Sequence, residues 1–251
     1  MGLSSNILWH QTNKESFYKI IKSKSLTCSY CLESFLDNQH KMGFPMISLS
    51  DIPLADIGEY LDQYGGYSLG FSRKWVVENG FNPVWYCEKS NRATVQHKQM
   101  LLDSYKNKQE NLIASNLTLL FYYGAYMKEI EGNLEVKSKN IKYNNYRFYD
   151  EREYRYIPDY NVLIQKNIPP FLNEDQYKDY KNINGNSQID VTLPFTFNDL
   201  KIIIVKTDKQ ANQLKEFLKN DDIHIFTHNE IKQSIIGIGH KIITEKIIKQ
   251  H

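Results

Sequence analysis

The segment "LKIIIVKTDKQANQLKEFLKNDDIHIF", residues 200–226, decides the fold class. Its first part, "LKIIIVKT", is a continuous apolar run that is typical of a buried strand. The following "DKQANQLKEFLKN" has helical spacing, and "IHIF" indicates a second short strand. The apolar positions that we expect to face inward from the helix are Ala211, Leu214, Phe217 and Leu218. A strand, a helix and a strand with short connections predict a unit of the βαβ type.

The remaining sequence predicts a mixture of strands and helices. "NILWHQT" indicates a strand ending at His10, and "KESFYKIIKSKS" indicates the first helix. "PMISLS" predicts a buried strand, "YGGYSLGFSRKWV" a strand bracketed by glycines that leads to a short helix, and "NPVWYCEKS" another strand. Residues 93–127 predict a largely apolar helical region. Residues 128–147 suit a loop or hairpin, residues 171–190 a polar loop with one short helix, and residues 235–251 an amphipathic helix. We therefore expect one α+β domain over residues 1–251, with a mixed, largely antiparallel sheet and flanking helices.

Composition narrows the class of protein. Hydrophobic residues make up 41% of the chain and aromatic residues 13%, which is ample for a core. The net charge is 31 − 29 = +2, which argues against broad binding to nucleic acid without excluding a local patch. No apolar run is long enough to span a bilayer, so we expect a cytoplasmic protein without a membrane segment.

The three cysteines predict neither a disulfide scaffold nor a metal site. Cys28 and Cys31 have the spacing of half a zinc site, but no second pair accompanies them. Recruitment of Cys87 and His40 would be needed to complete four ligands. Two ordinary thiols are the simpler interpretation, and we expect no metal.

The segment "FYDEREYRYIP", residues 148–158, is the most charged and aromatic part of the chain. It carries two of the five arginines, and a third, Arg147, directly precedes it. A strand here would place Glu151, Glu153 and Arg155 on one face, because side chains alternate along a strand. Such a face forms either a structural network of carboxylates neutralised by arginine or a reactive site.

The reactive alternative is an ADP-ribosyltransferase-like site that uses NAD. Such a site needs an early His that holds the dinucleotide, central Ser or Tyr residues, and a carboxylate that stabilises positive charge on the ribose. The order of residues along the chain fits this scheme. In this hypothesis Glu153, Glu151 and His10 are catalytic, and the cofactor contacts His10, Ser48, Ser50, Tyr64, Tyr67 and Arg155.

Four segments together resemble the AbiGi family of bacterial abortive-infection, phage-resistance proteins. They are "FPMISLSDIPLADIGEYLDQYGGYSLGFSRKW", "NPVWYCEKS", "FYDEREYRYIP" and "LKIIIVKT". The combination of "DIPL" with "DEREYR" is the specific part of this resemblance. The sequence departs from the family pattern at Ser48 and Ser50, where Cys is expected, and at Tyr154, where Trp is usual.

The resemblance implies a role in phage defence as the antitoxin of a two-component abortive-infection system. It supplies no reaction, so two hypotheses stay open. One is an NAD-dependent ADP-ribosyltransferase-like effector, and the other is a non-catalytic protein that binds and neutralises a partner toxin encoded alongside it. A nucleic-acid-binding module, suggested by Tyr and Lys in "NIKYNNYRFY", is less favoured because the chain is nearly neutral.

Overall fold

The computed structural model describes residues 6–37, 40–61, 64–106, 113–136, 141–219 and 222–235. The chain divides into two compact units. Unit 1 comprises the described parts of Met1–Leu26, Leu49–Gly80 and Pro194–His251, and unit 2 those of Thr27–Ser48 and Phe81–Leu193. Each unit is assembled from separate stretches of sequence. The single domain predicted over residues 1–251 stays a prediction.

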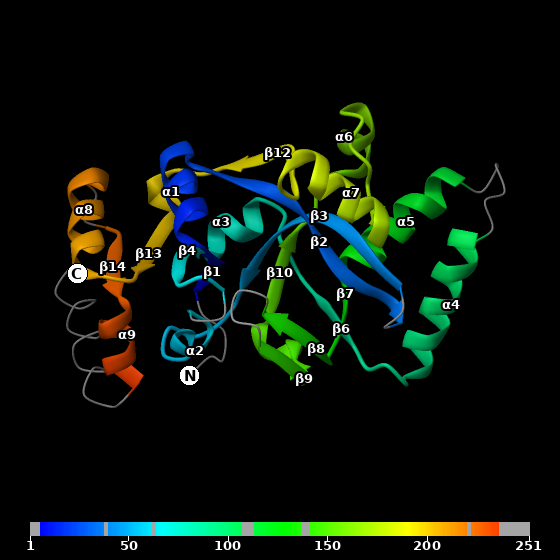
Figure 1. Ribbon diagram of the computed structural model, residues 1–251, viewed down its shortest axis with the longest axis horizontal. Helices are drawn as coiled ribbons and strands as arrows, with labels where there is room; N and C mark the ends of the chain where they lie inside the picture. Colours follow the sequence, from blue (N-terminus) through cyan, green and yellow to red (C-terminus); the bar gives the residue numbers. More distant parts are fainter. Residues whose placement is uncertain are drawn as a thin grey trace. The chain divides into compact units, whose positions relative to one another are not determined.

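Unit 1 is built on a sheet that ends in a parallel pair of strands. Strand β1 (Ile7–Thr12) lies between the end of β3 (His40–Ser50) and β4 (Tyr67–Ser72), antiparallel to both. Strand β13 (Leu200–Val205) is antiparallel to β4 and parallel to β14 (His224–Thr227). Helix α8 (Asp208–Leu218) connects these two strands, as Figure 1 shows. The predicted strand–helix–strand unit is confirmed.

Helices cover both faces of the unit 1 sheet. On one face, Trp9, Ile202, Ile204 and Phe226 pack against α2 (Ile57–Leu61) and α9 (His228–Ile235). The other face carries Phe71, which stacks on Trp75 of α3 (Arg73–Glu78). Helix α1 (Lys14–Ser23) buries Phe17 and Ile21, and Phe17 contacts the ring of Tyr67. Alternation along β1 and β4 thus gives the sheet two apolar faces.

Unit 2 contains the long strands, four helices and two small sheets. Strand β2 (Ser25–Asp37) is antiparallel to β3 and is flanked by β12 (Gln188–Pro194). Strand β10 (Glu153–Tyr156) pairs with β3 and with β5 (Asn82–Pro83), and β11 (Leu172–Asn173) also pairs with β3. Strands β6 (Trp85–Cys87) and β7 (Met127–Glu129) are parallel, and β8 (Glu131–Val136) and β9 (Ile141–Arg147) form a hairpin. The helices are α4 (Arg92–Lys106), α5 (Ile113–Tyr126), α6 (Tyr160–Gln165) and α7 (Glu174–Asn184).

The α+β class, with a largely antiparallel sheet and flanking helices, is confirmed. Several details differ from the predictions. Strand β1 continues past His10 to Thr12, and residues 82–87 form two short strands rather than one. Phe217 is 59% exposed, because the inward stripe of α8 consists of Ala211, Leu214 and Leu218. The predicted polar loop contains the eleven-residue helix α7, and residues 236–251 of the predicted last helix lie outside the described residues.

Within these described ranges, no helix is both long enough and apolar enough to cross a membrane.

Replacing Gly70 with Ala should destabilise unit 1 through steric overlap. A Cβ atom at Gly70 would lie 2.7 Å from Cγ2 of Ile7, 2.9 Å from Cζ3 of Trp9 and 3.1 Å from the carbonyl oxygen of Ile202. Overpacking of this kind costs roughly 1–3 kcal/mol. We expect the urea midpoint to fall without a change in the denaturant slope, and an unchanged midpoint would contradict the close packing of β1 on β4.

Candidate functional site: a buried charge network in unit 2

The charged segment 148–158 is not a continuous strand. Residues Phe148–Glu151 form a single 3₁₀ turn, which ends at Arg152, whose φ of 44° lies in the left-handed region. Strand β10 begins only at Glu153. The predicted alternation therefore holds for Glu153 and Arg155, which are both buried, but not for Glu151, which reaches the same cluster from the turn.

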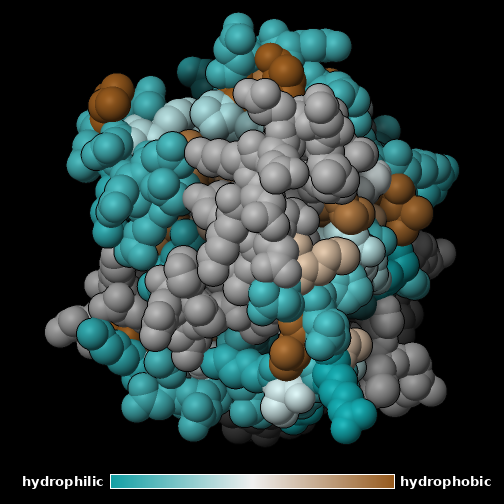
Figure 2. All heavy atoms as spheres, turned by 90° about the vertical axis from the view of Figure 1, so that its right-hand side faces the viewer, coloured by the Kyte–Doolittle hydropathy of each residue, from teal (hydrophilic) through white to brown (hydrophobic). Residues whose placement is uncertain are grey.

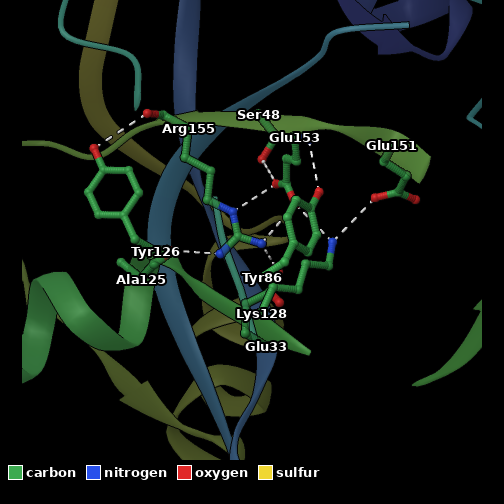
Figure 3. Close-up of polar contacts among 9 residues, drawn as sticks. All are labelled: Glu33, Ser48, Tyr86, Ala125, Tyr126, Lys128, Glu151, Glu153 and Arg155. Carbon is green, nitrogen blue, oxygen red and sulfur yellow. Dashed lines mark hydrogen bonds and ion pairs between the residues drawn. The ribbon is translucent and has the colours of Figure 1, made fainter. Parts of the chain in front are cut away.

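The carboxylate of Glu153 accepts four hydrogen bonds from three side chains (Figure 3). Its Oε1 accepts from the Ser48 hydroxyl at 2.7 Å and from Nε of Arg155 at 2.8 Å. Its Oε2 accepts from Nζ of Lys128 at 2.8 Å and from Nη2 of Arg155 at 2.9 Å. The side chain is only 8% exposed, so the charge of this carboxylate is balanced by protein groups rather than by water.

Arg155 is completely buried, and all three nitrogens of its guanidinium group donate hydrogen bonds. Besides the two-pronged contact with Glu153, it donates to the carboxylate of Glu33 at 2.9 Å and to the backbone carbonyl of Ala125. Ala125 lies in the last turn of α5, where carbonyl groups lack helical partners and the helix dipole favours a cation. Arg155 thus joins β10, β2 and the end of α5.

Lys128 contacts both Glu151 and Glu153, the two carboxylates that the sequence pattern predicts on one face. Its Nζ lies 2.8 Å from Glu153 and 3.3 Å from Glu151, and it sits over the ring of Phe148 at 4.6 Å from the centroid. The phenol oxygen of Tyr86 accepts the backbone N–H of Glu153 at 2.9 Å. Three carboxylates, from Glu33, Glu151 and Glu153, therefore share two cations, which leaves a formal charge of −1.

The ionisation of the network follows from burial and pairing. Burial acts to raise the pKa of Glu153, but Arg155 and Lys128 outweigh it and hold this pKa far below its ordinary value. Burial acts to lower the pKa of Lys128, and the carboxylates of Glu153, Glu33 and Glu151 outweigh it, so that pKa is raised. Glu153 and Lys128 are therefore both charged throughout the physiological range of pH.

The residues of the predicted NAD site are divided between the two units. Unit 2 contains Ser48, Glu151, Glu153 and Arg155, and unit 1 contains His10, Ser50, Tyr64 and Tyr67. His10 lies opposite Leu69 on β4, and the buried Tyr67 shares that face and accepts a hydrogen bond from Gln210. Ser50 lies opposite Trp9, on the other face of the sheet. Tyr64 precedes the loop at Gly65 and Gly66 and donates its backbone N–H to Tyr60. The NAD assignment of these residues stays a prediction.

Lys128, Glu33 and Tyr86 are members of the network that the sequence did not predict. Lys128 follows the apolar helix α5 and carries no local signal of burial. Glu33 offered a weak signal, since it is the first charged residue in the strand β2, after eight uncharged ones. All three contact Glu153 or Arg155 from distant parts of the sequence, and spacing cannot identify such contacts.

The cysteines near the network are protonated thiols. Burial, with a smaller contribution from Cys31, raises the pKa of Cys28 to about 12. Burial and the charge of Glu33 raise the pKa of Cys31 to about 12. Thiols with such pKa values are poor nucleophiles and poor metal ligands at neutral pH. In the described part of the chain, no three His, Cys, Asp or Glu side chains are grouped to hold a metal ion.

Comparison with known proteins gives the class. A family model described as "Putative abortive phage resistance protein AbiGi, antitoxin" matches residues 24–206. That range is most of the chain and contains every residue of the charge network. The chain belongs to this family, the AbiGi abortive phage-resistance proteins.

One curated relative has the same name as the family. The chain is 26% identical over 197 residues to "Abortive phage resistance protein AbiGi" of Lactococcus lactis subsp. cremoris. The alignment covers 70% of this chain and 76% of that protein. No solved structure matches, so the predicted likeness to ADP-ribosyltransferases stays a prediction.

Substitution of Glu153 by Gln should destabilise unit 2 strongly. The amide presents an N–H₂ group to cations that need an acceptor, and breaking a buried ion pair costs about 3 kcal/mol or more. The matched control is Glu15→Gln, which removes an equally short contact to Lys19 at 2.7 Å on the surface of α1. Urea denaturation should show a large loss for Glu153→Gln and none for Glu15→Gln. Equal effects would contradict the structural role of the network.

The network should also make the protein sensitive to acid. Because the pKa of folded Glu153 is depressed, its contribution is complete above the ordinary glutamate pKa of about 4.3 and is lost as pH falls toward the folded value. The difference in unfolding free energy between wild type and Glu153→Gln should therefore be constant near neutrality and shrink below about pH 4. A difference that stays constant down to about pH 2, measured by urea titration, would exclude this linkage.

Proposed function

We propose that this chain is the antitoxin of an abortive phage-resistance system, a non-catalytic protein that binds a toxic partner protein and restrains it. The description of its family, which includes the word antitoxin, supports this role. The partner is a protein encoded alongside the chain, as is usual for pairs whose toxin must be neutralised as it is made.

The occupancy of Glu153 carries the proposal. An ionised carboxylate has about four lone-pair positions, and Ser48, Lys128 and Arg155 fill four of them. A carboxylate that binds a ribose hydroxyl needs at least one position that faces substrate. At Glu153 that position would have to be created by displacing Ser48 or Lys128, each held at 2.8 Å or less. This geometry suits a structural network better than a reacting group.

A partially apolar surface in unit 2 suits a protein partner. Trp85 is 42% exposed and rests against the rings of Tyr123 and Tyr126. Leu119 lies one helical turn before Tyr123 and is also exposed, as is Val95 of α4. The side that carries α4 and α5 faces the viewer in Figure 2, where apolar side chains occur among polar ones. Exposed tryptophans of this kind commonly anchor protein partners.

The alternative function is the NAD-dependent ADP-ribosyltransferase that the order of residues predicts. It differs from the proposal in a measurable way. An enzyme would release nicotinamide from NAD, and Glu153→Gln would remove that activity from a folded protein. A structural Glu153 would instead affect the amount of folded protein and nothing else.

The test expresses the neighbouring gene product in a bacterial host, alone and with this chain. We expect growth arrest in the first case, recovery in the second, and co-purification of the two proteins. Trp85→Ser should weaken capture by tenfold or more while leaving the urea midpoint close to wild type. The matched surface control is Ile183→Ser on α7, since Ile183 is 82% exposed and lies on a different helix.

Two outcomes would overturn the proposal. One is the absence of both rescue and co-purification. The other is nicotinamide release from NAD by the purified chain that Glu153→Gln abolishes without loss of folded protein. Wild-type capture by Trp85→Ser would leave the proposed function standing and place the partner on another surface.

A further inference from the structure

Two buried polar atoms in unit 1 have no hydrogen-bond partner among the residues that the structure describes. They are Nε2 of Gln11 and Oγ of Ser68, and Ser68 is completely buried. Gln11 on β1 and Ser68 on β4 are directly opposite one another, so their side chains are on the same face of the sheet. Buried polar groups without partners are rare, because each loses its hydrogen bonds to water on folding. Two of them side by side point to a group beyond the described residues, such as a bound ligand, that satisfies them.

Lys206 and His228 converge on Gly66, at the end of the sheet where Gln11 and Ser68 lie. Ser68 lies opposite Ile204 on β13. Gly66 and Lys206 are each two residues beyond this pair, just outside the ends of β4 and β13. A Cβ atom at Gly66 would lie 2.5 Å from Cε and 3.2 Å from Nζ of Lys206, and 3.1 Å from Cε1 of His228. Nε2 of His228 is 2.7 Å from the carbonyl oxygen of Gly66. Only a glycine leaves room for both side chains here.

The topology places these groups where anions commonly bind. Strands β13 and β14 are parallel, and Lys206 and His228 directly follow their carboxyl ends. Helix α9 begins at His228, so its positive end is at the same edge of the sheet. Ligands of sheets with parallel strands bind at the carboxyl ends of those strands. The carboxylate of Glu230 on α9 is engaged by the backbone N–H and hydroxyl of Thr227.

The hydrogen-bond donors and the positive charge of these side chains indicate the kind of ligand. The Gln11 amide, the Ser68 hydroxyl and the Lys206 ammonium can all donate hydrogen bonds. Lys206 forms no ion pair with a carboxylate of the described residues, and its ammonium lies 5.7 Å from the centroid of the Tyr67 ring. We propose that Gln11, Ser68 and Lys206 bind a phosphate group at this end of the unit 1 sheet. Inorganic phosphate and phosphate monoesters carry negative charge and at least three terminal oxygens, one for each donor, whereas a carboxylate has two.

Lys206 supplies the positive charge of the proposed site. Its side chain is exposed and lies beside Gly66, and the four-carbon stem is flexible enough to swing toward a ligand. The ammonium then contacts the bound phosphate from the solvent side. This site is independent of the antitoxin role, because it uses none of the residues of the unit 2 network.

Phosphate binding is measured on the full chain by thermal unfolding and calorimetric titration. Sodium phosphate, adenosine monophosphate and sodium acetate are compared with sodium chloride at equal ionic strength. We expect phosphate or the monophosphate to raise the melting temperature with concentration, and acetate to act like chloride. Stabilisation by the monophosphate alone identifies a phosphate ester as the ligand, and stabilisation by both shows that the free ion suffices.

Three variants locate the binding. Ser68→Ala and Lys206→Gln should each weaken phosphate binding about tenfold or more, because each removes a donor to a charged ligand. Lys215→Gln on the exposed side of α8 is the charge-matched control and should bind like wild type. Without phosphate, Ser68→Ala should be at least as stable as wild type, since it removes an unpartnered buried hydroxyl.

Several results would overturn the proposal. They are no stabilisation beyond that of chloride, stabilisation by acetate equal to that by phosphate, and wild-type affinity in Ser68→Ala and Lys206→Gln. A crystal structure grown in phosphate that shows only water between Gln11 and Ser68 would do the same.

Discussion

Unit 2 depends on the contact between the buried carboxylate of Glu153 and the buried guanidinium of Arg155. The two side chains meet through two hydrogen bonds, of 2.8 and 2.9 Å, from one face of the short strand β10. Neither charge is tolerable alone in this environment, because removal from water costs several kcal/mol per ion. Every other contact of the network supplies a partner that makes their burial possible.

The network ties together segments that otherwise have little in common. Glu33 comes from β2, Ser48 from β3, Tyr86 from β6 and Lys128 from β7, and all contact Glu153 or Arg155. Apolar packing could stabilise the same elements equally well, since replacing a buried ion pair with apolar groups is often neutral. Directional hydrogen bonds add a requirement that apolar packing lacks: each segment must arrive in one position. We therefore attribute to the network the specific assembly of unit 2 rather than a large net gain in stability.

The sequence predicts the features that depend on residues close together in the chain and misses the contacts between residues far apart in it. The strand–helix–strand unit follows from apolar runs and spacing within residues 200–226, where every informative contact is local. Glu153 and Arg155 share a face because they are two residues apart in a strand, whereas the left-handed Arg152 breaks the same rule for Glu151. Ser48 is 105 residues from Glu153 and Lys128 is 25 residues away, and no spacing rule connects such pairs. Similarly, only the register of β1 on β4 reveals that Gln11 and Ser68 are neighbours.

A double-mutant cycle between Glu153 and Lys128 tests the central claim most directly. The unfolding free energies of Glu153→Gln, Lys128→Met and the double variant are measured by urea denaturation at neutral pH. If the two groups form one structural network, the double variant should be less destabilised than the sum of the single variants, by about 2 kcal/mol. Additivity within about 0.5 kcal/mol would mean that they act separately, which would contradict the network as the basis of unit 2.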